Sequence, residues 1–394
     1  MDAHKRNWAL FLARCSSLNN RPSILRTVLG DLDMVHLLHR AYMLAKNKSQ
    51  IKSFLGKIMG QSINRQIQLV ETPTGKLGKE HFKLVEGTVP SAAAGEALLR
   101  TQYISLDAAN RAWMQGATYR DAVESGQVMA GGAIAEVVES KDPSLAVGDL
   151  VFADTGWQDY AALPAKKLQK LPNLSPITHL LSVYGVAGLT AYFGLLHVGL
   201  PKPGETILVS AAAGSVGSLV SQIAKAAVPD CKVIGIAGSD EKCQWIQDEL
   251  GYDAAINYKT QPVYKALKEV APEGVDVYFD NVGGDILEAA LFRMNLFGRI
   301  ACCGAVSQYD GAAPTAGPRG VPGLIVTKRL NLRGFIMSDF PEHMEKARAD
   351  LQEWVAAGKI KVQEDIIDGL ENTPAALIGL LAGDNRGKRM VKVV

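Results

Sequence analysis

The sequence predicts an α/β protein that combines a doubly wound parallel sheet with a second, strand-rich domain. From about residue 184 onward, helical segments alternate with short apolar strands near residues 207, 234, 277 and 300, the order that builds a parallel sheet. Before that point, short β-rich units follow one another with turn residues between them, which is typical of a separate strand-rich domain. These units are expected over residues 65–71, 82–89, 96–106, 131–138 and 150–153.

The end of the chain returns to the strand-rich domain. A long helix is expected over residues 342–357 and a closing strand over residues 389–394. We therefore expect residues 63–183 and 338–394 to form the strand-rich domain, and residues 184–337 to form the domain with the parallel sheet.

Residues 1–62 differ from the rest of the chain, with ten Lys or Arg against three Asp. They show no apolar core followed by a small-residue cleavage site, as a secretory signal would. They are predicted to be an N-terminal extension.

A buried strand, a glycine-containing turn and the start of a helix follow one another over residues 206–217. Gly214 lets the backbone approach a pyrophosphate closely, and Gly217 lets the helix pack tightly on the sheet. Ala212 stands where the usual pattern has its first glycine, and the turn is completed by Ser215 and Val216. The turn predicts a dinucleotide-binding site in a Rossmann domain. A close helix–sheet contact without any ligand is the alternative.

The second strand of this unit, expected over residues 232–237, indicates which dinucleotide is bound. An NAD enzyme carries Asp or Glu about 20 residues beyond the glycines to hold the ribose 2′-hydroxyl. Here Gly238 and Ser239 follow the strand, and their N–H groups and hydroxyl can bind a 2′-phosphate, while Lys242 adds a cation. Asp240 is expected to cap the next helix. The sequence therefore predicts NADPH, although Lys242 without this turn would be an ordinary solvated lysine.

Composition and charge exclude several classes of protein. With 394 residues, 47% of them hydrophobic and 21% charged, the chain is typical of a globular protein long enough for two domains. Forty-two basic residues balance 40 acidic ones, so the net charge of +2 produces no strong field for nucleic acid. No apolar run reaches the roughly 20 residues that span a bilayer. We expect neither a nucleic-acid partner nor a membrane partner.

The cysteines and histidines predict no metal site. Five cysteines lack C-x-x-C spacing, and the seven histidines form no ligand pattern. An odd number of cysteines in a chain of this length fits a reducing compartment, so a cytoplasmic location is predicted. We interpret the adjacent Cys302 and Cys303 as small apolar residues at a strand end, with a redox-sensing role as the alternative.

Further blocks accompany the turn at 206–217: residues 103–107 with Arg111, 184–194, 237–242, 257–260, 279–284, 304–309 and 383–388. Together they resemble the zinc-independent medium-chain dehydrogenase/reductase superfamily, in particular its leukotriene B4 dehydrogenase, prostaglandin reductase, curcumin reductase and 2-alkenal reductase group. The resemblance covers about residues 64–394. It implies a Rossmann domain joined to a GroES-like barrel domain, and a homodimer.

The resemblance also implies a role for each matching residue. Lys242 and Tyr258 would contact the adenosine 2′-phosphate. Asn281 and Asn385 would hold the cofactor, and Tyr309 would lie beside the nicotinamide ribose. These roles suit the side chains, because an asparagine presents both a donor and an acceptor, and a phenol can relay a hydrogen bond. Taken singly, Tyr258 would be a strand tyrosine, Asn281 a turn residue and Tyr309 a loop tyrosine.

The predicted function is NADPH-dependent reduction of the C=C bond of α,β-unsaturated ketones or aldehydes, without zinc. Alcohol oxidation is disfavoured because the developing alkoxide would lack a metal. In the reduction, hydride reaches the β-carbon, charge moves to the carbonyl oxygen, and Tyr309 is expected to donate a hydrogen bond to that oxygen. Two alternatives stay open: an NADPH-dependent quinone reductase of the same superfamily, and an NADPH-binding sensor without turnover.

Overall fold

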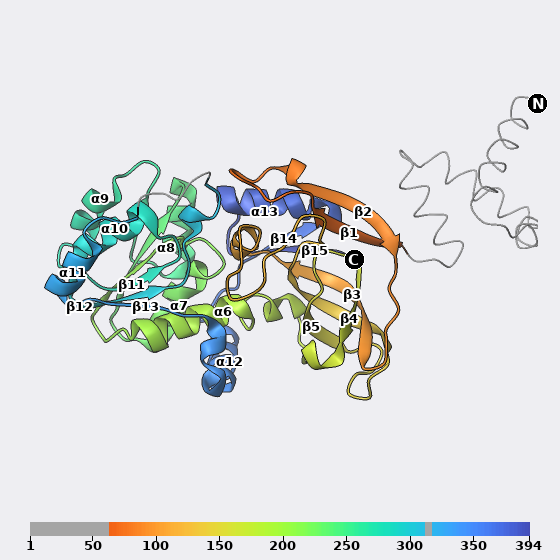
Figure 1. Ribbon diagram of the computed structural model, residues 1–394. Helices are drawn as coiled ribbons and strands as arrows, with labels where there is room; N and C mark the ends of the chain where they lie inside the picture. Colours follow the sequence, from red (N-terminus) through yellow and green to blue (C-terminus); the bar gives the residue numbers. More distant parts are fainter. Residues whose placement is uncertain (1–62, 312–316) are drawn as a thin grey trace, which may run out of the picture. The chain divides into compact units, whose positions relative to one another are not determined.

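The computed structural model describes residues 63–311 and 317–394 (Figure 1). The predicted N-terminal extension, residues 1–62, lies outside the described residues. Asn64–Val394 form one compact unit. Its strands build two large sheets and one small one. The expected domain boundaries at residues 183/184 and 337/338 stay a prediction.

One large sheet has six parallel strands in the order β10-β9-β8-β11-β12-β13. The predicted doubly wound parallel sheet is confirmed. The chain starts at the centre with β8, winds outward to β10, and returns to the centre with β11. The bounds are β8 Thr206–Val209, β9 Lys232–Ala237, β10 Ala254–Asn257, β11 Val275–Asp280, β12 Met294–Cys302 and β13 Asn331–Gly334.

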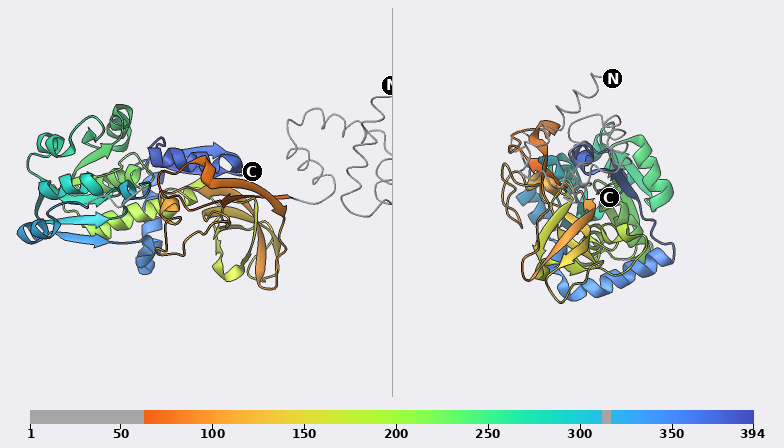
Figure 2. Two further views of the ribbon diagram at one scale, coloured as in Figure 1. Left: turned by 45° about the horizontal axis from the view of Figure 1, so that its top comes forward. Right: turned by 90° about the vertical axis from the view of Figure 1, so that its right-hand side faces the viewer.

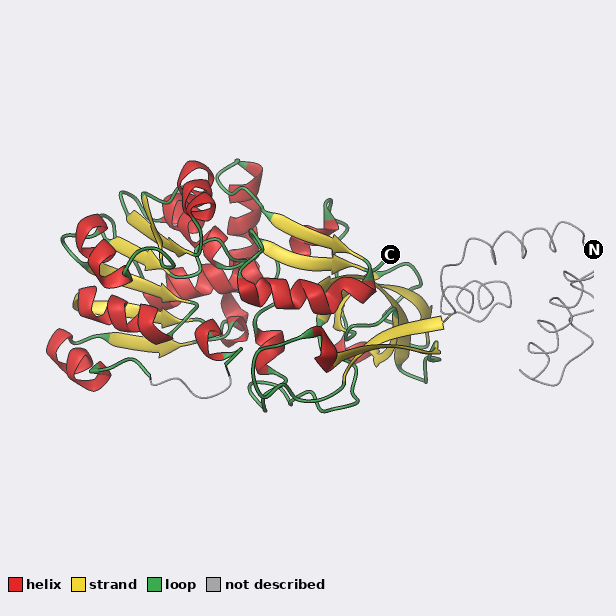
Figure 3. Ribbon diagram, turned by 90° about the horizontal axis from the view of Figure 1, so that it is seen from above, coloured by secondary structure: helices red, strands yellow, loops and turns green. Residues whose placement is uncertain are grey.

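Helices cover both faces of this sheet, as Figure 3 shows from above. Alternate residues of a strand point to opposite faces. Ile207 and Val209 therefore pack with one group of helices, and Leu208 packs with the other. The first group is α6 Val186–Phe193, α7 Gly217–Ala227, α8 Asp240–Leu250 and α12 Met344–Ala356, and the second is α9 Val263–Val270, α10 Gly284–Arg293 and α11 Val321–Lys328. Burial on both faces explains why the strands read as continuous apolar runs.

Two of the expected helices are continued by short segments of another helix type. Helix α6 continues without a break into a π-helical segment, η4 (Gly194–Gly199), and the expected long helix begins with a short 3₁₀ turn, η7 (Pro341–His343), before α12. The other short 3₁₀ helices are η1 Lys79–His81, η2 Ala165–Lys167, η3 Ile177–Leu180, η5 Val306–Gln308, η6 Met337–Asp339 and η8 Leu370–Asn372.

The second large sheet has seven strands in the order β14-β15-β3-β4-β5-β7, with β6 also paired to β3. The predicted strand-rich domain is confirmed. The final strand, β15, pairs with β3, so the end of the chain does join this sheet. The bounds are β3 Glu96–Ser105, β4 Gly132–Ser140, β5 Leu150–Asp154, β6 Tyr160–Pro164, β7 Gln169–Lys170, β14 Glu364–Asp368 and β15 Lys388–Lys392.

A small sheet and two helices pack beside these strands. Strands β1 (Ile63–Leu69) and β2 (Phe82–Thr88) pair with each other. Helix α13 (Thr373–Ala382) lies close to them (Figure 2), and Leu377 of this helix shares an apolar core with the buried Trp157. A single turn of helix, α5 (Ala109–Ala112), follows β3.

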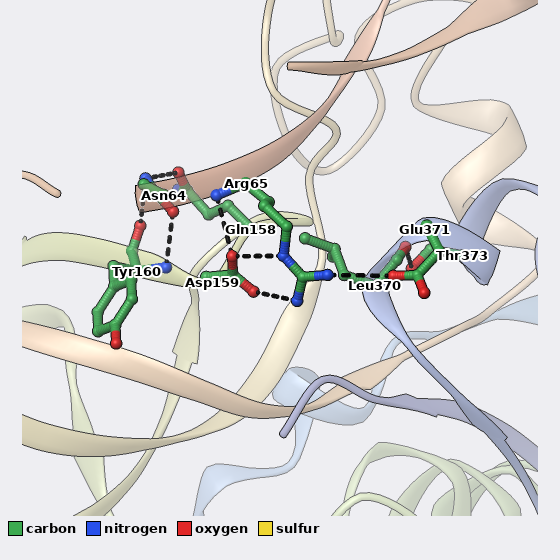
Figure 4. A network of polar contacts seen from close by, with 8 residues as sticks. All are labelled: Asn64, Arg65, Gln158, Asp159, Tyr160, Leu370, Glu371 and Thr373. Carbon is green, nitrogen blue, oxygen red and sulfur yellow. Dashed lines mark hydrogen bonds and ion pairs between the residues drawn. The ribbon is translucent and has the colours of Figure 1, made fainter. Parts of the chain in front are cut away.

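A polar network fastens the first described strand to the segment before β6 (Figure 4). The Arg65 guanidinium donates to both carboxylate oxygens of the buried Asp159, at 2.9 Å each. The Asn64 amide donates to Gln158 and to the backbone oxygen of Tyr160. Bidentate pairs of this kind fix geometry as well as contributing energy.

Among the described residues, none of the helices combines the length and the apolar character needed to cross a membrane.

Candidate active site

The candidate site begins where β8 ends, at the point where the strand order of the parallel sheet reverses. Ligands of doubly wound sheets bind beside the carboxyl ends of the strands at such a point. Helix α7 starts at Gly217, directly after the predicted glycine turn. A Cβ at Gly217 would lie 2.3 Å from the carbonyl oxygen of Ala211 and 2.8 Å from Cα of Ala212. Only glycine therefore lets α7 begin this close to the end of β8.

The turn itself differs from the expected pattern in one detail. Ala211, not Ala212, has the left-handed backbone conformation, with φ of 48°. Ala212 is fully buried, and its N–H donates to the carbonyl oxygen of Ile236 at 2.9 Å. A Cβ at Gly235 would lie only 2.9 Å from the Ala212 methyl group. The small side chain of Ala212 is thus required by the contact between the turn and β9.

The start of α7 presents free backbone donors. Among the hydrogen bonds of the described residues, none is donated by the N–H groups of Val216 or Gly217. Such groups at a helix N-terminus attract anions, and here they lie next to the turn that the sequence assigns to a pyrophosphate. The residues present therefore fit a dinucleotide.

The loop after β11 is tied to the end of β8. The Asn281 amide nitrogen donates to the Ser210 backbone oxygen at 2.7 Å, and the Asn281 N–H donates to the Ser210 hydroxyl at 2.9 Å. The buried Asp280 accepts from the Tyr278 hydroxyl at 2.7 Å and from the N–H groups of Val282 and Gly283 at 2.9 Å. Asn281 thus shapes the rim of the site, and its amide oxygen is left to bind a ligand. Asp280 was missed in the sequence analysis.

At the end of β9, one sequence-based expectation is wrong. Helix α8 begins at Asp240, and its N-cap is Ser239, whose hydroxyl oxygen accepts the N–H of Lys242 at 3.2 Å. Asp240 does not cap the helix. Its carboxylate instead accepts from the Asn257 amide at 2.7 Å. Ser239 takes the cap because it adopts the extended backbone conformation that this position requires, and its hydroxyl hydrogen is still free to donate.

Tyr258 lies next to the small turn after β9. A Cβ at Gly238 would come within 3.2 Å of the Tyr258 ring and 3.4 Å of the Lys259 side chain. Tyr258 is 46% exposed, and Lys259 is also exposed. The structure therefore brings together the turn residues and the tyrosine that the resemblance assigns to the 2′-phosphate.

Lys242 joins the parallel sheet to the turn after α13. Its ammonium donates to the backbone oxygens of Gly383 at 2.5 Å and Asn385 at 2.6 Å, which leaves one N–H for another partner. Burial lowers the pKa of Lys242, and the nearby Arg386 adds to this effect. Arg386 and Lys259 are the exposed cations beside it.

The same turn also contacts the glycine turn directly. The Gly387 N–H donates to the Ala213 oxygen at 2.9 Å, and Gly214 and Gly387 form a parallel β-bridge. Asn385 is buried and donates to the Gly387 oxygen at 2.8 Å. Residues separated by about 170 positions in sequence thus share one edge of the candidate site.

Tyr309 follows the short helix η5, beyond the end of β12. Its hydroxyl oxygen accepts the N–H of Ala305 at 3.1 Å. A Cβ at Gly304 would lie 3.3 Å from the Asn281 oxygen and 3.6 Å from the Tyr309 hydroxyl. The absence of a side chain at Gly304 therefore lets Tyr309 lie close to the loop after β11. Tyr309 and Asn281 thus share the same edge of the sheet.

An ion pair from the strand-rich part of the molecule lies near Cys303, the residue that follows β12. Lys388 is buried, and its ammonium donates to the Asp107 carboxylate at 2.5 Å and to the Leu106 backbone oxygen at 2.9 Å. Asp107 also accepts from the Ser105 hydroxyl at 2.8 Å. Its carboxylate is thus already neutralised and hydrogen-bonded.

Cys302 ends β12 and Cys303 follows it, near the carboxylates of Asp280 and Asp107. Burial raises the pKa of the Cys302 thiol to about 11, and burial together with Asp280 raises that of Cys303 to about 12. Thiols with raised pKa values are poor nucleophiles at neutral pH. Over residues 63–311 and 317–394, no three His, Cys, Asp or Glu side chains gather closely enough to hold a metal ion.

The parallel sheet with its glycine turn, next to a strand-rich sheet, defines the architecture of a dinucleotide-binding oxidoreductase. Family comparison agrees with this architecture. Residues 65–171 match the family described as the N-terminal domain of oxidoreductase, and residues 215–353 match the family described as zinc-binding dehydrogenase.

Individual relatives resemble nearly the whole described chain. Bovine (Bos taurus) prostaglandin reductase 1 is 44% identical over 79% of this chain and 93% of its own length. The NADPH-dependent curcumin reductase of Escherichia coli (strain K12) is 40% identical over 84% and 97%. The crystal structure of CurA from Vibrio vulnificus in complex with NADPH has a TM-score of 0.80 and 40% identity, over 84% of this chain and 99% of that one.

The chain belongs to the medium-chain dehydrogenase/reductase superfamily, in the group of prostaglandin, curcumin and 2-alkenal reductases. The family predicted from the sequence is therefore confirmed. The roles assigned to individual residues stay predictions.

Proposed function

We propose that this protein uses NADPH to reduce the carbon–carbon double bond of α,β-unsaturated ketones or aldehydes. The observation that carries the proposal is the contact between the glycine turn and the turn 383–387, which joins the free N–H groups of α7 to the basic residues around Lys242. The first group suits a pyrophosphate and the second a 2′-phosphate. The names of the curcumin and 2-alkenal reductases support the same cofactor and reaction. They also support the prediction that the protein is an NADP-dependent oxidoreductase.

We assign the cofactor contacts to residues of three loops. Val216 and Gly217 would hold the pyrophosphate through backbone N–H groups, and Gly214 and Ser215 would let the turn approach it closely. Around the adenosine phosphate we place Gly238, Ser239, Lys242 and Tyr258, with Asn281 and Asn385 on the two flanking loops. Ala212 contributes by keeping the turn close to β9.

When bound, NADPH supplies the hydride for the reaction. Tyr309 then has the main task among the protein groups. Its hydroxyl oxygen already accepts from Ala305, so its hydrogen is directed elsewhere and can be donated to the substrate carbonyl oxygen. A donor in this position stabilises the negative charge that the oxygen acquires as the double bond is reduced.

Zinc has no part in the proposed mechanism. The Asp107 carboxylate, which lies near Cys303, is held by the Lys388 ammonium, whose positive charge would repel a metal cation. Charge on the substrate oxygen is stabilised instead by the Tyr309 hydroxyl.

The proposal includes a homodimer. Strand β13 lies at one edge of the parallel sheet. Near it, Leu296, Phe297 and Val326 are 58%, 64% and 72% exposed, which is unusual for large apolar side chains. A second copy of the chain can extend the sheet at this edge and cover them. Light scattering after gel filtration tests this: a mass of one chain would contradict it.

The cysteines support a cytoplasmic location. Cys231, Cys243, Cys302 and Cys303 are free thiols. Free thiols are typical of proteins in a reducing compartment.

Product analysis tests the proposed reaction. The purified protein is incubated with NADPH or NADH and with a simple enone, an enal or a quinone. We expect the saturated ketone or aldehyde, with NADPH preferred. A hydroquinone as the main product would support the quinone reductase alternative. Binding of NADPH without consumption in the whole panel would support the sensor.

A further inference from the structure

The segment that carries Tyr309 is held from the strand-rich part of the molecule. The Gln115 amide donates to the Tyr309 backbone oxygen at 3.0 Å. The next residue, Asp310, accepts the N–H of Leu77 at 2.7 Å and the guanidinium Nε of Arg111 at 3.1 Å, both on the same carboxylate oxygen. Three hydrogen bonds, one from Leu77 and two from the segment that holds Arg111 and Gln115, therefore converge on two consecutive residues.

Arg111 is the unusual member of this group, because its side chain is completely buried. Its Nη2 donates to the backbone oxygens of Gly75 at 2.8 Å and Pro73 at 3.3 Å. Its Nη1 has no hydrogen-bond partner within the part of the chain that the structure describes. Burying a guanidinium is costly, and a carboxylate partner offsets the cost. Asp310, at 20% exposure, is that partner.

Stability alone explains this arrangement poorly. A buried ion pair seldom stabilises a fold more than apolar residues of the same shape would, and here one donor is left over. What the pair does provide is a fixed position for residue 310. Since the Tyr309 hydroxyl is also held by Ala305, the tyrosine is fixed at both its backbone and its hydroxyl group.

We propose that Arg111 and Asp310 are positioning residues that hold the Tyr309 hydroxyl in the orientation needed for catalysis. This inference rests on the proposed function of Tyr309. A hydrogen-bond donor stabilises developing charge only when its geometry is preorganised, and small displacements are costly. Loss of the ion pair therefore slows the chemical step while leaving the distant nucleotide contacts intact.

A double-mutant cycle tests the inference. Asp310→Asn keeps an acceptor for Leu77 but removes the charge beside Arg111. We expect it to lower kcat for an enone about tenfold, with the NADPH Kd changed less than about twofold. Tyr309→Phe lowers kcat by a similar or larger factor. In the Tyr309→Phe background, Asp310→Asn should have almost no further effect on kcat. An equal, independent effect in that background would overturn the inference.

A conservative variant and a matched control separate positioning from stability. Arg111→Lys keeps the positive charge without the planar fork, so it should retain more activity than Arg111→Met. Asp159→Asn disrupts another Arg–Asp pair, the one with Arg65 in Figure 4, away from Tyr309. This control should lower the melting temperature and leave kcat within about twofold. A loss of kcat in the control as large as in Asp310→Asn would contradict the inference.

Amide hydrogen exchange supplies a readout without cofactor or turnover. Asp310→Asn should speed exchange in residues 304–311, and Asp159→Asn should not. Unchanged exchange in Asp310→Asn would contradict the inference. If the wild-type protein reduces no enone, the proposed function fails, while exchange still reports whether Asp310 holds this segment.

Discussion

The two ends of the candidate site are built in different ways. At the nucleotide end, the Asp280 carboxylate accepts hydrogen bonds from its own loop and from the Ser210 hydroxyl at the end of the neighbouring strand β8. The backbone oxygen of Ser210 in turn accepts from the Asn281 amide. At the other end, Tyr309 and Asp310 are held by Leu77, Arg111 and Gln115, about 200 positions away in sequence. The glycine turn and the loop after β11 are therefore held together within one sheet, and the turn 383–387 joins them from the strand-rich part. The Tyr309 end exists only when the two large sheets are in place.

This difference predicts a separation of effects. Changes in the glycine turn should weaken cofactor binding and leave the Tyr309 segment undisturbed. Changes around Arg111 should slow chemistry and leave cofactor affinity nearly unchanged.

The largest effect is expected for Gly217→Ala. The added Cβ would lie 2.3 Å from the Ala211 oxygen, so α7 must move away from the strand end. We expect the NADPH Kd to rise about 100-fold or more and unfolding free energy to fall by about 2–4 kcal/mol. Calorimetry and thermal unfolding check these values. Gly323→Ala is the control, because its Cβ meets nothing within 4 Å. Faster hydrogen exchange in residues 304–311 of Gly217→Ala would contradict the expected independence of the Tyr309 segment from the glycine turn.

A smaller effect is expected for the exposed cations beside Lys242. The Lys242 ammonium already donates two hydrogen bonds, to Gly383 and Asn385. The exposed side chains of Lys259 and Arg386 are therefore more available to bind a 2′-phosphate. We expect the affinity for NADPH to fall about 5- to 10-fold in Lys259→Gln and in Arg386→Gln, and the affinity for NADH to stay unchanged. Lys167→Gln, an exposed lysine of η2, is the matched control. Equal losses for both nucleotides would place the phosphate elsewhere.

The smallest effect is expected for the cysteines. Since the pKa values of Cys302 and Cys303 are raised to about 11 and about 12, few thiolates exist at neutral pH. Labelling by iodoacetamide at pH 7.5 should be slow, and its rate should rise about tenfold per pH unit below these values. Cys302→Ser should change kcat less than about twofold. Rapid labelling at pH 7.5 with loss of activity would favour the sensor.

The same contrast explains what the sequence could predict. The glycine turn, the residues after β9 and the alternation of strands and helices are local patterns, and they identified the fold class and the family. The pairing of Lys242 with the turn 383–387 and of Arg111 with Asp310 depends on how distant segments meet, which no local pattern encodes.

The error at Asp240 has a similar origin. Asp and Ser are both good N-cap residues, so composition alone could not rank them. The extended backbone at Ser239 and the pairing of Asp240 with Asn257 decided the matter. Asp280 was missed because a buried carboxylate that accepts from its own loop leaves no spacing signal in the sequence.

The measurement that tests the central claim most directly follows the transferred hydrogen. The protein is given an enone and NADPH that carries deuterium at both C4 positions of the nicotinamide, and the product is analysed by NMR and mass spectrometry. We expect a saturated ketone with deuterium on the former β-carbon. Deuterium on the carbonyl carbon of an alcohol, or an unlabelled product, would contradict it.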